Sequence, residues 1–163
     1  MRRTAQKAGL LAAGIGVAGA VTVAAAMAQE PDATYRDINA TLGSVPTMFK
    51  AMDPSGIAGA WTEFKAVQLN PNTALSGKEK ELIGLAVAAQ IPCTYCIYFH
   101  TQAAKLNGAT DAEVREAVAM AAITRHWSTV LNGMQVDPAG FRQETDTVLH
   151  LASDRMKAAS AAR

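Results

Sequence analysis

The sequence predicts an all-α protein, folded as a compact helical bundle. Apolar residues recur at spacings of three and four along most of the chain, as they do on one face of an α-helix. No stretch alternates apolar and polar residues over a length that would indicate a strand. Capping boxes at residues 76–79 and 110–113 mark helix starts, and Asn-Gly pairs at residues 107–108 and 132–133 mark helix ends.

Residues 1–28 have the pattern of a secretory signal peptide. Arg2, Arg3 and Lys7 give a positively charged start, residues 8–26 are apolar, and residues 26–28 (Ala-Met-Ala) fit the small-residue cleavage rule. The apolar segment is also just long enough for an uncleaved membrane anchor. Its many small residues and the cleavage box favour removal instead. We therefore expect a secreted or periplasmic protein with no stable membrane anchor after cleavage.

The remaining residues, 29–163, have the length of one ordinary domain. The full chain carries a formal charge of +1, and removal of the three cations of the signal leaves −2. Neither an internal repeat nor a basic patch with interleaved aromatic residues is present in the sequence, so nothing indicates nucleic-acid binding. We predict a single helical domain over residues 29–163, with its core motif region at residues 76–133.

Turn residues divide this domain into a series of helices. Gly, Pro and Asn clusters separate the apolar periodic segments, and Asp137-Pro138 marks the start of the last one. The expected helices are residues 33–41, 47–52, 57–69, 76–90, 92–107, 111–131 and 138–158. We expect the helix at 111–131 to bury Val114, Ala117, Val118, Ala121 and Ala122. The last helix is expected to pack against the body through Phe141, Val148, Leu149 and Ala152.

The candidate site is the pattern Glu81-x11-Cys93-x2-Cys96-x3-His100, which contains both cysteines of the chain. Pro92 suits the first position of a helix, so both cysteines are expected in the first turns of the helix at 92–107. The free N–H groups and the positive end of the helix dipole there favour a thiolate over a thiol. Spacings of three and four place Cys93, Cys96 and His100 on one helix face.

Glu81 belongs to the preceding helix, among apolar neighbours. A carboxylate is costly to bury without a partner, so we expect it to reach His100 directly or through a water molecule. A redox-active dithiol is the interpretation that we favour for this pattern.

Other interpretations of the cysteine pair are weaker. A structural disulfide would close a loop of only four residues, which stabilises by about 2 kcal/mol. Three ligands along one helix do not converge easily on a tetrahedral zinc ion, and no second Cys/His cluster exists in the sequence. Attachment of a c-type haem requires a histidine directly after the second cysteine, where this chain has Ile97. We therefore expect no metal and no cofactor.

The pattern resembles the signature of the AhpD-like group within the carboxymuconolactone decarboxylase superfamily, whose members are small all-helical peroxidases and disulfide reductases. The resemblance covers roughly residues 76–133, and Tyr95 stands where some members have a histidine. It implies a thiol-dependent peroxidase with peroxiredoxin-like activity, in which Cys96 attacks the peroxide and Cys93 resolves the sulfenic acid. His100 would take the proton from Cys96, and Glu81 would orient His100. It also implies an external dithiol reductant and a homo-oligomer, a trimer or hexamer.

Three alternatives stay open. Cys93 could be the attacking thiol, as the more exposed cysteine of a CxxC pair often is. The chain could instead be a non-redox lyase of the decarboxylase branch, or a helical assembly module with incidental thiols. Outside the cytosol, the dithiol needs either a dedicated reductant or a role in disulfide exchange. Arg125 and His126 lie near the end of the helix at 111–131, and we interpret them as cations that suit the negative end of their own helix.

Overall fold

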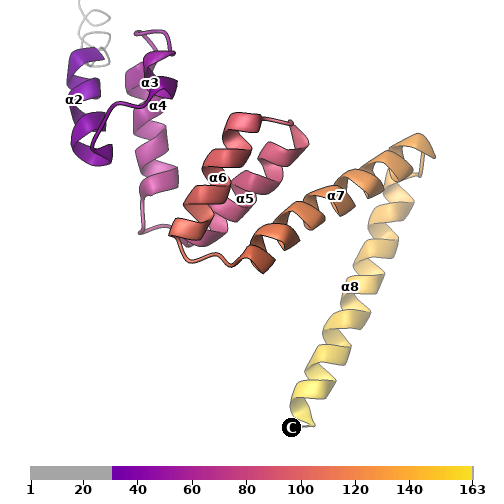
Figure 1. Ribbon diagram of the computed structural model, residues 1–163. Helices are drawn as coiled ribbons and strands as arrows, with labels where there is room; N and C mark the ends of the chain where they lie inside the picture. The colour runs from indigo at the N-terminus through magenta and orange to yellow at the C-terminus, as the bar shows by residue number, and fades with distance from the viewer. Residues whose placement is uncertain (1–30, 163) are drawn as a thin grey trace, which may run out of the picture. The chain divides into compact units, whose positions relative to one another are not determined.

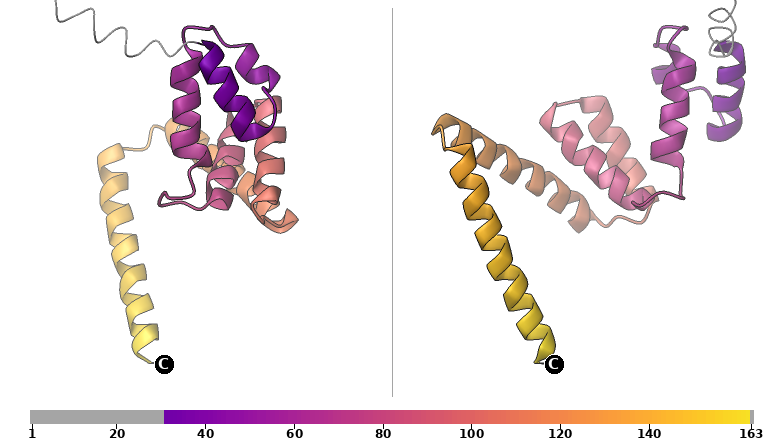
Figure 2. Two further views of the ribbon diagram at one scale, coloured as in Figure 1. Left: turned by 90° about the vertical axis from the view of Figure 1, so that its left-hand side faces the viewer. Right: turned by 180° about the vertical axis from the view of Figure 1, so that it is seen from behind.

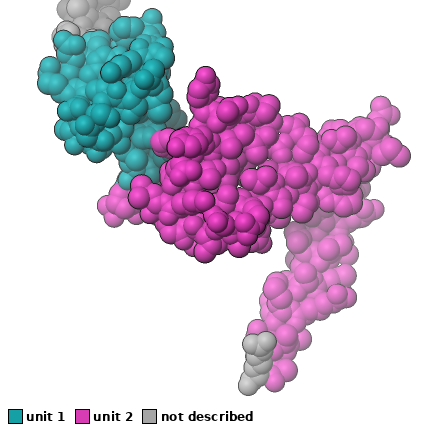
Figure 3. Space-filling model, in the orientation of Figure 1, with its two compact units in different colours: residues 1–70 teal, residues 71–163 magenta. Residues whose placement is uncertain are grey.

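The computed structural model describes residues 31–162, which contain no β-strand and are mostly helical (Figure 1). The predicted all-α fold is confirmed. The chain divides into two compact units, Met1–Asn70 and Pro71–Arg163 (Figure 3). The predicted signal peptide at residues 1–28 lies outside the described residues, and a single domain over residues 29–163 stays a prediction. Within residues 31–162, no helix is both long enough and apolar enough to cross a membrane.

The described part of the first unit is built from four short helical elements. They are α2 (Pro31–Leu42), α3 (Thr47–Lys50), α4 (Ile57–Glu63) and the π-helix η1 (Phe64–Leu69). The sequence predicted one continuous α-helix at 57–69, and the structure changes to a π-helix halfway along it. The core of the unit consists of Ile38, Phe49, Ile57 and Trp61, all buried.

Asp37 anchors this core from its edge. It accepts a hydrogen bond of 2.7 Å from the indole Nε1–H of Trp61 and also pairs with the ammonium group of Lys65. The hydrogen bond from Lys65, followed by that from Trp61, lowers the pKa of the Asp37 carboxyl. The aromatic ring of Trp61 packs edge-on against Phe49, with the ring centroids 5.3 Å apart.

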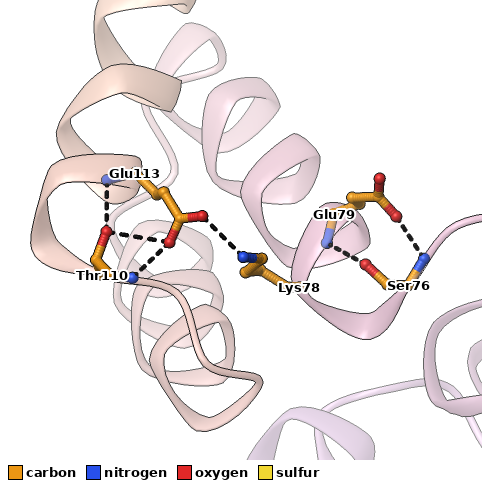
Figure 4. Close-up of polar contacts among 5 residues, drawn as sticks. All are labelled: Ser76, Lys78, Glu79, Thr110 and Glu113. Carbon is orange, nitrogen blue, oxygen red and sulfur yellow. Dashed lines mark hydrogen bonds and ion pairs between the residues drawn. The ribbon is translucent and has the colours of Figure 1, made fainter.

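The second unit contains α5 (Gly77–Gln90), α6 (Thr94–Leu106), α7 (Asp111–Gly133) and α8 (Pro138–Ala161). The first three pack side by side (Figures 1 and 2). Both predicted capping boxes are present, at the starts of α5 and α7. Lys78 in the first turn of α5 donates a hydrogen bond of 2.8 Å to Glu113 in the first turn of α7 (Figure 4). This ion pair ties the two helix starts together.

Burial in this unit is narrower than the sequence predicted. On α5, only Glu81, Leu85 and Ala88 are buried. On α7, Ala121 is buried and Val114 and Ala117 are half-buried, whereas Val118 and Ala122 are exposed. The expected packing of α8 is wrong for this chain by itself, because Phe141, Val148, Leu149 and Ala152 are exposed. Helical periodicity identifies an apolar face of a helix, but it does not show what covers that face.

Candidate active site

The turn between α5 and α6 places the first cysteine against the end of α5. The Ile91 N–H donates to the Val87 carbonyl, and the Cys93 N–H donates to the Ala88 carbonyl at 3.0 Å. Pro92 between them has no N–H to satisfy. We expected Pro92 to open the next helix, but α6 begins two residues later, at Thr94. Pro92 lies within the turn, and Cys93 takes the N-cap position that precedes the first helical residue.

Cys93 is the N-cap residue of α6. Its sulfur accepts a hydrogen bond of 3.2 Å from the backbone N–H of Cys96. A serine or aspartate side chain usually accepts this bond, because the first N–H groups of a helix have no partner within the helix. The contact points the positive end of the helix dipole at the Cys93 sulfur, which favours a thiolate there once the pair is reduced.

Cys93 and Cys96 form a disulfide, with their Cα atoms 5.2 Å apart. Both cysteines are half-buried, so the bridge lies at the surface of the unit and not in its core. Neither cysteine is free in this state. A half-buried disulfide is accessible to attack by an external thiolate.

Glu81 and His100 form a direct contact between α5 and α6. The distance from Glu81 Oε2 to His100 Nδ1 is 2.7 Å, and the glutamate side chain is only 6% exposed. The expected contact between these two side chains is present, while their catalytic roles stay a prediction. A hydrogen bond from Nδ1–H to a carboxylate fixes the orientation of the ring and directs Nε2 away from the carboxylate. His100 follows Cys96 by one turn of α6, so the two share a helix face.

Gly84 makes room for the His100 ring, a role that the sequence analysis missed. A Cβ atom added at Gly84 would lie 2.5 Å from both Cε1 and Nδ1 of His100. Gly84 follows Glu81 by three residues in α5, so the carboxylate and the space for the imidazole lie on the same face of that helix. The available signal was a glycine inside a helix, which costs about 1 kcal/mol relative to alanine and therefore needs a packing reason.

Arg125 has a different partner from the one the sequence predicted. It does not lie in the last turn of α7, which continues to Gly133. Its Nε donates to the Gln90 side-chain oxygen at 2.6 Å, and its Nη2 donates to the Gln90 backbone carbonyl at 3.1 Å. Because Gln90 is the last residue of α5, Arg125 complements the negative end of α5 and not that of its own helix.

The comparisons with known proteins agree with this geometry. The model of the carboxymuconolactone decarboxylase family matches residues 56–137, which include all four predicted site residues. The chain therefore belongs to the carboxymuconolactone decarboxylase family. Within it, the chain is AhpD-like. Its fold matches the crystal structure of the alkylhydroperoxidase AhpD core from Rhodospirillum rubrum with a TM-score of 0.59 and 29% identity, over 78% of this chain and 98% of that one.

The chain is also similar to a curated protein whose description names no activity. "Uncharacterized protein 4 in cox locus" from Paracoccus denitrificans is 33% identical over 86 residues, which cover 50% of this chain and 78% of the relative. Among residues 31–162, no three His, Cys, Asp or Glu side chains are grouped so that they could hold a metal ion.

Proposed function

We propose that this protein is a thiol-dependent peroxidase and disulfide oxidoreductase that uses the Cys93/Cys96 dithiol. The observation that carries the proposal is the disulfide between these cysteines at the start of α6, in the same helix as His100 with its buried carboxylate partner. A disulfide across a helix start is the oxidised product that such a reaction would leave. A lyase of this family would have no need of the pair.

The first step would oxidise Cys96. His100, held by Glu81 through Nδ1, takes the Cys96 proton on Nε2. The thiolate attacks the terminal oxygen of the peroxide, the O–O bond breaks, and the leaving alkoxide takes the proton from the imidazolium to become an alcohol. Cys96 becomes a sulfenic acid, so the sulfur has lost two electrons and the peroxide has gained them.

The second step would close the disulfide. The Cys93 thiolate attacks the sulfenic sulfur, the S–O bond breaks, and the hydroxide takes up the proton that Cys93 had released and leaves as water. The N–H of Cys96 supports this step, because its hydrogen bond to the Cys93 sulfur favours the thiolate form. An external dithiol must then supply two electrons to restore both thiols. The opposite order, with Cys93 attacking first, would use the same contact to activate the peroxidatic thiol.

The experiment is peroxide-dependent loss of thiols in the reduced mature protein. We expect two thiols per chain to disappear, with a single intramolecular disulfide as the product. In Cys93→Ser, the Cys96 sulfenic acid should persist and react with dimedone, whereas Cys96→Ser should give no such adduct. Unchanged peroxide turnover in both variants would refute the mechanism and favour the lyase or an assembly module. A dimedone adduct only in Cys96→Ser would reverse the order of the two cysteines.

We further propose that the protein acts outside the cytosol, in the periplasm or as a secreted protein, after removal of residues 1–28. The support is the sequence pattern of those residues alone. Its partners would be a small peroxide, an external dithiol and further copies of itself in a trimer or hexamer. Mass spectrometry of the exported protein and light scattering of the purified protein test these two points.

A further inference from the structure

The second unit contains an open pocket between the end of α5 and the middle of α7. Its volume is about 540 Å³, within the range of small-molecule sites. Its wall is mainly apolar, with surface from Ala89, Pro92, Val118 and Ala122. The polar groups that line it are Gln90, Arg125 and His126, and no acidic side chain belongs to the lining. An apolar wall with the guanidinium group of Arg125 beside it fits a molecule that is apolar along its length and negatively charged at one end.

Arg125 is held in place before any ligand arrives. Its two hydrogen bonds to Gln90 use Nε and Nη2. Gln90 is fixed in turn, because its side-chain nitrogen donates to the Ala121 carbonyl of α7. A guanidinium group has five N–H donors, so these bonds orient the group and leave donor capacity for a carboxylate. A pre-organised cation loses less side-chain entropy on binding than a mobile one.

The pocket includes the residue that immediately precedes the two cysteines in the sequence. Pro92 lines it and immediately precedes Cys93, whose N–H is bonded to the Ala88 carbonyl next to the lining residue Ala89. One residue of the pocket wall is therefore the direct sequence neighbour of the disulfide. This location favours a role of the pocket in substrate binding over a role as a remote regulatory site.

We infer that this pocket binds an aliphatic chain ending in a carboxylate, and that it selects carboxylate-bearing organic hydroperoxides as substrates. The claim about substrate selection rests on the proposed peroxidase function, whereas the claim about carboxylate binding does not. The apolar wall would hold the chain, and Arg125 would pair with the carboxylate. Binding of the carboxylate can be measured without turnover, so the two proposals can fail separately.

Binding is tested by calorimetric titration of the oxidised protein with decanoate, and with decanol as the uncharged probe. We expect saturable binding of decanoate and weaker binding of decanol. Arg125→Gln should weaken the binding of decanoate by about tenfold, because one hydrogen bond to a charged group is lost. Ala122→Leu should weaken binding of decanoate by narrowing the pocket while leaving Arg125 intact. Ala112→Leu, an exposed site on α7 outside the pocket, is the matched control and should bind as the wild type does.

Selectivity is tested by comparing kcat/KM for linoleic acid hydroperoxide and its methyl ester. We expect the acid to be preferred by about tenfold, and the preference to vanish in Arg125→Gln while turnover of the ester persists. Failure of the wild type to bind decanoate, or equal binding by Ala122→Leu, would overturn the site. Equal turnover of acid and ester would overturn its role in selectivity. Binding of decanoate without turnover of any peroxide would refute the proposed function but leave the carboxylate site standing.

Discussion

Replacement of Gly84 by alanine tests whether the Glu81–His100 contact governs the reactivity of the cysteines. The added methyl group would lie 2.5 Å from two atoms of the imidazole and 2.9 Å from a third. Carbon atoms in contact are ordinarily about 3.5–4.0 Å apart, so the ring must move by roughly 1 Å. A movement of that size away from α5 lengthens the 2.7 Å hydrogen bond to Glu81 beyond the useful range.

Two opposing free energies set the expected change in stability. Alanine in place of glycine inside a helix stabilises by about 1 kcal/mol. Loss of a hydrogen bond to a charged group costs about 1.5–3 kcal/mol. We therefore expect a net destabilisation of roughly 0.5–2 kcal/mol by urea unfolding. Peroxide-dependent oxidation of the thiols should slow by about 100-fold, the lower end of what a positioned acid or base contributes.

The double variant with His100→Ala isolates the cause. Without the imidazole, the methyl group of Gly84→Ala meets no ring, so the same substitution should now stabilise the protein by up to about 1 kcal/mol. Gly59→Ala is the control, because a Cβ there meets nothing within 4 Å; it should leave thiol oxidation unchanged. The reasoning is refuted if Gly84→Ala is as reactive as the wild type, or if its effect on stability has the same sign with and without His100.

Two further predictions concern the ion pairs of the two units. Hydrogen bonds from Lys78 and, to a smaller extent, from the backbone and side chain of Thr110 lower the pKa of Glu113 from 4.5 to about 2 in the folded state. The stability that this carboxylate contributes is therefore present above about pH 5 and is lost as the pH falls towards 2. Glu113→Gln should flatten that part of an acid-unfolding curve. An unchanged curve would contradict the assignment. In the first unit, Asp37→Ala should lower the midpoint of thermal unfolding more than Asp37→Asn, because an amide oxygen can still accept a hydrogen bond from the Trp61 indole N–H. Tryptophan fluorescence monitors the transition. Equal midpoints would argue against that hydrogen bond.

Local chemistry explains why most of the helices could be predicted from the sequence. The capping boxes at Ser76 and Thr110 involve residues three apart in the chain, and both appear as predicted. The start of α6 was misplaced because cysteine is not among the usual N-cap residues, so Pro92 looked like the stronger signal. Its sulfur accepts the same N–H that an oxygen would accept.

The features that the sequence did not predict depend on contacts between distant residues. Gly84 matters only because His100, on another helix, occupies the space that a side chain would fill. Arg125 finds its partner 35 residues away, at the end of α5. The exposed apolar residues of α8 are a further example. Helical periodicity marks an apolar face in the same way whether this chain or another molecule covers it.

The helix α5 links these features into one site. Glu81, Gly84 and Ala88 recur at three- and four-residue spacing and thus lie on one face. The first supplies the carboxylate, the second the space for the imidazole, and the third the carbonyl that anchors Cys93. A rotation of α5 about its axis would therefore change the histidine contact and the position of the first sulfur together. Leu85, on the adjacent part of that face, is almost fully buried, so packing resists such a rotation. The core of the unit thus holds the two cysteines and the proposed base in register.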